Sequence, residues 1–126
     1  MKNIRFFKCS VCGSVDVEFF EGPGKRICCG ESMQELAPNT TDAATEKHIP
    51  VIERNGDTVT VKVSTVEHPM TPEHYIAFIM IAHGNKIQKA ALTPSDKPVA
   101  TFTVPAGEKV VAYEYCNIHG LWQSQE

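Results

Sequence analysis

Five cysteines are spread unevenly along this chain, and their spacing limits its possible folds more than any other feature. Four of them lie within the first thirty residues, as a C-x2-C pair followed after fifteen residues by an adjacent pair: Cys9, Cys12, Cys28 and Cys29. The fifth, Cys116, lies in the stretch YEYCNIHGLW near the other end. An odd number of cysteines argues against a disulfide framework. The first residues, MKNIRFFKCS, show no secretory signal, so we expect a cytoplasmic protein.

The four early cysteines predict a metal ion held tetrahedrally by sulfur. Gly13 follows Cys12 directly, which is typical of a metal-binding knuckle because glycine permits a tight turn. The alternative is a pair of disulfides, or one disulfide between the adjacent Cys28 and Cys29. Zinc and iron accept the same four ligands. An adjacent pair is unusual for a zinc ribbon, however, and this favours iron.

Composition narrows the classes of protein that remain. With 126 residues, 42% of them hydrophobic, the chain can bury one modest core, or one core and a small satellite unit that needs a cross-link or metal to be stable. The longest apolar run, YIAFIMIA at 75–82, is the length of a strand and too short to span a membrane. Twelve basic and fifteen acidic residues give a net charge of −3 without a basic stripe. We therefore expect neither membrane insertion nor nucleic-acid binding.

Three segments follow from the sequence pattern. Residues 1–36 form the predicted cysteine unit, in which SVDVEFFEG at 14–22 has the pattern of a short strand. Residues 37–45, APNTTDAAT, are small and polar without periodicity, which is typical of a linker. Residues 46–126 form the second predicted domain.

The second domain has the pattern of an all-β fold. In DTVTVKVSTV at 57–66, alternation places Val59, Val61 and Val63 on one face. Five further stretches have strand character: 48–54, 74–83, 86–92, 99–104 and 109–116. Turn signals such as Asn55-Gly56 separate them. Six or seven short strands at this spacing predict an immunoglobulin-like β-sandwich after the cysteine unit.

Four of the five histidines lie in predicted loops or at strand ends, where functional groups collect on a rigid scaffold. These are His48, His68, His74 and His119, the last spaced i, i+3 from Cys116. Each alone could be a hydrogen-bonded, partly buried ring. Four imidazoles with one thiol instead predict a site for iron, copper, zinc or nickel. His83 ends an apolar strand, and we expect it to be a surface or turn histidine without a metal role.

A blue-copper electron carrier is an alternative for this second site, because such proteins combine a β-sandwich with an early histidine and a late Cys-x-x-His. They also need a weak axial ligand, often a methionine, after the last histidine. No methionine follows His119, and His68 and His74 would have no function. The blue-copper interpretation is therefore disfavoured.

The motifs CSVC, CC, EKHIPV, EHPMTPEHYI and CNIHGLW together resemble the desulfoferrodoxins, the two-iron superoxide reductases. The resemblance spans nearly the whole chain and implies two mononuclear iron sites. In the first, Cys9, Cys12, Cys28 and Cys29 would bind iron as in desulforedoxin. In the second, Cys116 would be an axial ligand, and the equatorial ligands would be His48, His68, His74 and His119. The family also implies a homodimer and a rubredoxin-like electron donor.

The same resemblance implies the one-electron reduction of superoxide to hydrogen peroxide, at ferrous iron with one open position. It places Lys47 at the mouth of that position, and Glu46 as a carboxylate that can occupy it after oxidation. The alternative for both residues is a solvated charge in a flexible linker, without a role in the site. Two other functions stay open: an electron carrier without a substrate site, and a zinc-stapled interaction module. The first iron could relay electrons or only stabilise its unit.

Overall fold

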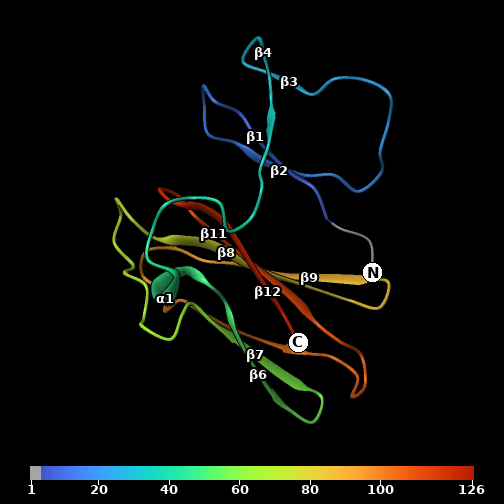
Figure 1. The fold of residues 1–126 in the computed structure, drawn as a ribbon, viewed down its shortest axis with the longest axis vertical. Coiled ribbons are helices and arrows are strands. Elements are labelled where there is room, and N and C mark those ends of the chain that lie inside the picture. Colours follow the sequence, from blue (N-terminus) through green and yellow to red (C-terminus); the bar gives the residue numbers. More distant parts are fainter. Residues whose placement is uncertain (1–3) are drawn as a thin grey trace. The chain divides into compact units, whose positions relative to one another are not determined.

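The computed structural model describes residues 4–126, which fall into two compact units that divide between Ala37 and Pro38 (Figure 1). The described residues are almost entirely strands and loops, which confirms the predicted all-β class. The described part of the chain contains no helix that is both long and apolar enough to cross a membrane. The finer boundaries, 1–36, 37–45 and 46–126, stay a prediction.

The first unit has a small sheet and one short hairpin. The sheet is antiparallel in the order β2 (Val15–Val17), β1 (Phe6–Lys8), β5 (Gln34–Glu35), and the hairpin joins β3 (Ile27–Cys28) to β4 (Glu31–Ser32). Among its described residues, Phe6, Phe7 and Cys9 are the buried hydrophobic ones, so this core is very small. The predicted strand at 14–22 forms only over β2, and Phe19 and Phe20 beyond it are exposed.

The second unit is a sandwich of two antiparallel sheets (Figure 1). One has the order β10 (Val99–Thr103), β7 (Thr58–Lys62), β6 (Val51–Asn55). The other has the order β12 (Gly120–Gln125), β11 (Val111–Cys116), β8 (Ile76–His83), β9 (Lys86–Ala91). Seven strands in two sheets confirm the predicted sandwich.

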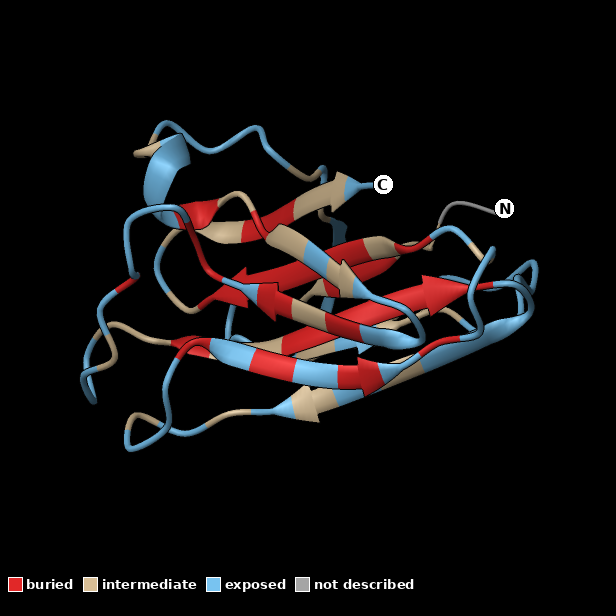
Figure 2. Ribbon diagram, turned by 90° about the horizontal axis from the view of Figure 1, so that it is seen from below, coloured by how far each residue is buried: buried red, intermediate tan, exposed pale blue. Residues whose placement is uncertain are grey.

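Both sheets contribute to one core. Val59, Val61 and Val63 are buried as the alternation predicts, and they share a hydrophobic cluster with Ile79 and Ile81 of β8. Figure 2 shows this pattern on some strands as red buried bands between exposed or intermediate residues. Cys116 belongs to the same cluster. The core therefore holds one end of β11 rigidly, and this is the end that carries the thiol.

Strand β12 was not predicted, because GLWQSQ contains no β-branched residue and does not alternate. It forms because all six of its residues pair with β11, from Val111↔Gln125 to Cys116↔Gly120. On its other side, Asn39 donates its N–H to Leu121 O at 3.0 Å and accepts from Gln123 N at 2.8 Å. A residue of the predicted linker is thus attached to the sandwich.

A short helix, α1 (Thr45–His48), also lies outside the predicted elements. Four residues are too few to show helical periodicity in a sequence. The helix begins where the predicted linker ends, so Glu46 and Lys47 have helical backbone.

The predicted surface position of His83 was wrong, because this residue is 2% exposed. Its Nδ1 lies 2.7 Å from Oε1 of Glu108, and its Nε2 lies 2.9 Å from Nε2 of Gln88. The loop between β10 and β11 carries Glu108 over the end of β8 and covers the imidazole. His83 is therefore an internal hydrogen-bonded residue rather than a surface one.

Candidate metal centres

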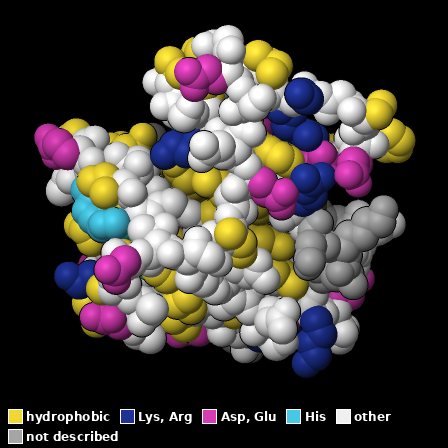
Figure 3. Space-filling model, turned by 45° about the horizontal axis from the view of Figure 1, so that its top comes forward, with side chains coloured by type: hydrophobic (Ala, Val, Ile, Leu, Met, Phe, Trp, Pro, Cys, Tyr) yellow, Lys and Arg dark blue, Asp and Glu magenta, His cyan; other side chains and the backbone are white. Residues whose placement is uncertain are grey.

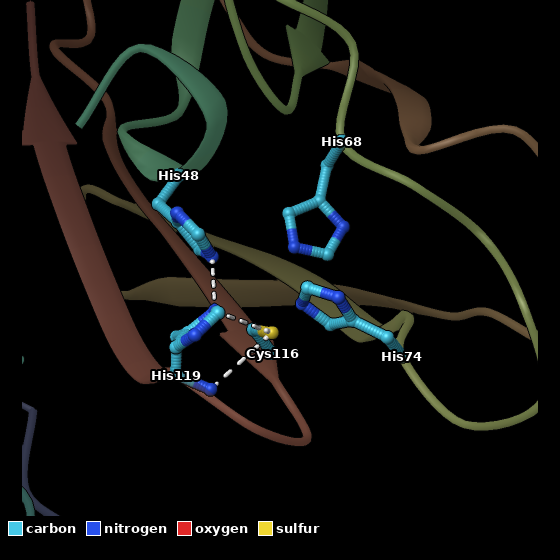
Figure 4. Close-up of side chains that lie close together, drawn as sticks. All are labelled: His48, His68, His74, Cys116 and His119. Atoms are coloured by element: carbon cyan, nitrogen blue, oxygen red, sulfur yellow. Dashed lines mark hydrogen bonds between the residues drawn. The ribbon is translucent and has the colours of Figure 1, made fainter. Parts of the chain in front are cut away.

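The structure brings together all five residues predicted for the second site. They are His48, His68, His74, Cys116 and His119, and one ligand atom from each lies within 4.8 Å of those of the others. Three kinds of element supply them: helix α1 ends in His48, the loop between β7 and β8 carries His68 and His74, and the end of β11 with the following turn carries the other two. Figure 4 shows the rings and the thiol pointing toward a common centre.

Backbone hydrogen bonds fix the loop against the helix. Val66 N donates to Glu46 O at 2.9 Å, and Thr65 Oγ1 donates to the same carbonyl at 3.1 Å. His68 N donates to Val63 O at 2.9 Å, at the end of the β7 segment. The first two bonds connect the helix that carries His48 to the loop that carries His68.

Hydrogen bonds to backbone carbonyls select which imidazole nitrogen faces the site. His48 Nδ1–H donates to Ala44 O at 2.7 Å, and His68 Nδ1–H donates to Pro69 O at 2.7 Å. A neutral imidazole with its proton on Nδ1 has a free lone pair on Nε2. Both rings are therefore oriented to offer Nε2 to a metal, with a carbonyl on the outer nitrogen as in many metal sites.

The site fits a metal ion because it contains buried nitrogens without a partner. Nε2 of His68 and Nε2 of His74 are both buried, and neither has a hydrogen bond within the described chain. An unsatisfied buried polar group costs about 1–3 kcal/mol, which a coordinate bond to a metal would remove. His119 offers Nδ1, which lies 3.9 Å from Sγ of Cys116. Four imidazoles and a thiolate are a donor set suited to iron.

Burial keeps these imidazoles in the form that binds metals. Desolvation lowers the pKa of His68 to about 4 and also lowers the pKa of His48 and of His74. Neighbouring imidazoles lower the pKa of all three further. The rings are therefore neutral near pH 7, and a metal ion would not have to displace their protons.

The thiol of Cys116 is fully buried, and desolvation raises its pKa. Two backbone N–H groups act in the opposite direction: His119 N donates to Sγ at 3.4 Å, and Ile118 N also lowers the pKa. A metal ion would supply the remaining stabilisation of the thiolate. The end of β11 and the following turn thus carry two candidate ligands, Cys116 and His119, together with two N–H donors to the sulfur of Cys116.

The four early cysteines form the other group, again with all ligand atoms within 4.8 Å of one another. Sγ of Cys28 lies 3.7 Å from Sγ of Cys12 and 4.0 Å from Sγ of Cys29. Tetrahedral sulfur ligands at about 2.3 Å from a metal are separated by roughly 3.8 Å, so these distances fit such an ion. The adjacent pair reaches this geometry because Cys29 has a left-handed φ of 53° and Gly30 one of 77°.

Hydrogen bonds make the four thiols unequal. The side chain and the backbone of Ser14 bond to Cys12 and, with smaller contributions from other thiols, lower its pKa to about 6. Bonds from Cys9 and Cys12 hold the proton on Cys28 and raise its pKa to about 12. Cys9 is buried, whereas Cys12 and Cys29 are exposed. One side of this site therefore faces solvent.

Glu46 and Lys47 are both exposed and directly precede His48 on α1. The charge of Lys47 contributes to the lowered pKa of His48 and of His74, so it acts on two of the candidate ligand rings. In Figure 3 histidine atoms reach the surface as one small patch. His74 and His119 are only partly buried, which gives the site contact with solvent.

Two residues near the second site were not predicted. Trp122 is buried, stacks on His48 with ring centroids 4.9 Å apart, and donates Nε1–H to His119 O at 3.1 Å. Glu114 is fully buried, and burial raises the pKa of its carboxyl to about 9. The alternation Ala112, Glu114, Cys116 along one face of β11 is the sequence signal that could have identified Glu114 as an inward-facing carboxyl.

Known proteins resemble this chain over nearly its full length. The family described as Desulfoferrodoxin matches residues 40–125, and the one described as Desulfoferrodoxin, N-terminal domain, matches residues 2–36. A desulfoferrodoxin homolog from Archaeoglobus fulgidus is 46% identical over 96% of each chain, and the desulfoferrodoxin of Nitratidesulfovibrio vulgaris is 41% identical over 94% of each. The crystal structure of the superoxide reductase from Treponema pallidum is 38% identical, with a TM-score of 0.80 over 98% of this chain and 99% of that one. This chain belongs to the desulfoferrodoxin family.

Proposed function

We propose that this protein is a superoxide reductase, which adds one electron and two protons to superoxide to give hydrogen peroxide. The observation that carries the proposal is the convergence of four imidazoles and one thiol from distant segments, with two buried nitrogens that have no other partner. The family adds support, because the solved structure from Treponema pallidum is that of a superoxide reductase.

Iron is the cofactor that fits both ligand groups. His48, His68, His74, His119 and Cys116 would hold one ion, and Cys9, Cys12, Cys28 and Cys29 would hold the other. Ferrous iron held by the four imidazoles and Cys116 would supply the electron for the reduction of superoxide. The protein's part is to fix the five ligand atoms, keep the imidazoles neutral and supply an electron-rich sulfur.

Cys116 is the ligand through which the protein tunes this chemistry. A thiolate is a strong electron donor, and the N–H groups of His119 and Ile118 moderate that donation by hydrogen bonding to Sγ. Burial excludes water from the sulfur, so these bonds act at low dielectric.

Lys47 attracts the substrate. Superoxide is an anion and the protein carries a net charge of −3, so capture needs a local positive charge. Lys47 is exposed, and its charge reaches His48 and His74. Glu46, the adjacent carboxylate, stays a proposed ligand of the oxidised iron, supported by its position two residues before His48 on α1.

The partners are proposals of the same kind. A small rubredoxin-like protein would return the electron, and two copies of the chain would form a homodimer. Iron in the four-sulfur site could relay electrons or only stabilise the first unit. Four sulfur ligands suit one-electron transfer, and the exposure of Cys12 and Cys29 would let an electron donor approach the site. Five unpaired cysteines are compatible with a cytoplasmic location.

The test is to mix the anaerobically reduced, iron-loaded protein with superoxide and measure both products. A reductase forms one hydrogen peroxide for each superoxide consumed and releases no oxygen. A dismutase forms half as much peroxide and releases oxygen, and that result would overturn the proposal. An electron carrier would leave superoxide unreacted, and addition of azide would not change its spectrum. A zinc-stapled interaction module would be colourless.

A further inference from the structure

We propose that Asn117 is a positioning residue, whose side-chain amide attaches the loop carrying His74 to the turn carrying Cys116 and His119. The inference rests on the proposed function to the extent that the five ligands hold iron. Asn117 lies between Cys116 and His119 in the sequence, and we infer that it sets the distance from these two proposed ligands to His74.

The backbone ladder between β8 and β11 ends at this residue. Cys116 pairs with Ile76, after an irregularity in the register at Tyr115 and Cys116. One more backbone bond follows, from Asn117 N to Tyr75 O at 3.2 Å. The chain then turns to bring His119 into the site, so the next peptide groups of that chain no longer run along the loop.

The amide of Asn117 continues the ladder past this point. Oδ1 accepts the N–H of Tyr75 at 2.8 Å, and Nδ2 donates to Glu73 O at 2.9 Å. One carbonyl and one N–H are the groups that a peptide unit would present, so the side chain replaces a missing peptide. The two residues that it binds are the two neighbours of His74. The backbone on both sides of this ligand is thus held by one side chain.

The bonds within residues 71–74 shape the loop without attaching it to the turn. Thr71 N donates to His74 O at 2.9 Å, and His74 N donates to Thr71 Oγ1 at 3.1 Å. Both partners belong to the loop itself. They can hold the conformation of residues 71–74 while the whole loop moves relative to Cys116. The bonds from Asn117 restrict that motion.

The relation between His74 and His119 depends on this attachment. Their ring centroids lie 5.0 Å apart, and Nε2 of His74 is buried without a partner. Loss of the Asn117 bonds would let this nitrogen move away from the other ligands. Residues that orient metal ligands typically change metal affinity by about 10- to 100-fold when replaced. We expect a loss in that range for the second site and no loss for the four-cysteine site.

The experiment follows ferrous iron as it moves from the protein to a chelator, with Asn117→Ala compared with the unaltered chain. The absorption of the four-sulfur iron in the same sample reports the first site. Gln88→Ala is the matched control, because it also removes an amide bonded to a backbone carbonyl, Thr103 O at 2.8 Å. Gln88 pairs with Ile81 near the opposite end of β8. Asn117→Asp keeps the acceptor for Tyr75 and loses the donor to Glu73, so it serves if the alanine variant folds poorly.

The expected result is a 10- to 100-fold weaker hold on the second iron in both Asn117 variants, with Gln88→Ala unchanged. Retention within twofold of the unaltered protein would overturn the inference. So would equal loss from both iron sites, or an equal loss in Gln88→Ala, because either would indicate general loosening. The readout is iron transfer and not catalysis. A fully loaded protein that fails to reduce superoxide would therefore contradict the proposed function and leave this inference standing.

Discussion

Nδ1 of His119 lies 3.0 Å from Nε2 of His48, although the two residues are 71 positions apart in the chain. The nitrogen of His48 carries a lone pair, because its Nδ1–H donates to Ala44 O. In a metal-loaded site both nitrogens would turn their lone pairs to one ion. Trp122 holds this pair in place, since it stacks on His48 and donates Nε1–H to His119 O.

Replacement of Trp122 by Phe tests that support. The variant keeps an aromatic face for His48, but it loses the indole N–H bond to His119 O and part of the buried ring. A neutral hydrogen bond contributes about 1 kcal/mol, so we expect about fivefold weaker iron binding at the second site. Competition with a ferrous chelator measures the iron affinity of this site. Unchanged affinity would mean that the turn holds His119 without this bond.

Replacement of Cys116 by serine tests the proposed chemistry more directly. We expect Cys116→Ser to lose the visible absorption band that arises from thiolate-to-iron charge transfer, and to lose superoxide reduction, because serine is a weaker electron donor. Stopped-flow absorption with metal analysis checks both. Substantial reduction of superoxide by iron-loaded Cys116→Ser protein would remove the sulfur from the mechanism.

Substrate attraction depends on Lys47. We expect Lys47→Ala to slow the second-order reaction with superoxide severalfold and to weaken its dependence on ionic strength, because salt screens the charge that the variant lacks. Lys86→Ala is the matched control, an exposed lysine at the start of β9 that pairs with His83. Equal effects of the two substitutions would attribute the change to net charge rather than to position.

Residues that repeat a pattern could be predicted from the sequence, and residues that depend on tertiary packing could not. Val59, Val61 and Val63 alternate with polar residues, and they are buried as alternation predicts. The candidate metal ligands could be found because cysteine and histidine are rare and their chemistry is specific. Strand β12 has no such signal, since its pairing with β11 and Asn39 alone makes it a strand.

Contacts between distant segments set the burial of single polar residues, and a local pattern does not record them. His83 sits beside a turn glycine, which indicates exposure, but Glu108 lies 25 positions away and covers it. Asn117 is likewise one residue of a motif, and its bonds to Glu73 and Tyr75 span more than forty positions. Such residues can be assigned a function only after the fold is known.

Removal of metal should affect the two units differently. Among the described residues of the first unit, only Phe6, Phe7 and Cys9 are buried hydrophobics, a core too small to fold without its ion. We expect a strong chelator, or Cys12→Ser, to abolish hydrogen-exchange protection in β1 and β2. The sandwich has its own core and should keep protection in β8 and β11. Protection of β1 that survives metal removal would contradict a structural role for the first ion.

The pair of Arg54 and Glu126 predicts a pH dependence of stability. Arg54 Nη2 lies 2.8 Å from Glu126 Oε1, which also accepts Val110 N–H at 3.0 Å. Bonding to Arg54 lowers the pKa of Glu126 below its ordinary value of 4.5. A lowered acid pKa stabilises the fold above pH 4.5, and that stabilisation is lost as pH falls through the folded-state pKa.

Glu126→Gln should therefore cost about 1 kcal/mol near pH 7 and progressively less below pH 4.5. Urea unfolding at several pH values measures it, with Glu53→Gln in the exposed pair with Lys62 as a control expected to change little. An effect of Glu126→Gln that is the same at pH 7 and at low pH would show that the charge of Glu126 contributes nothing.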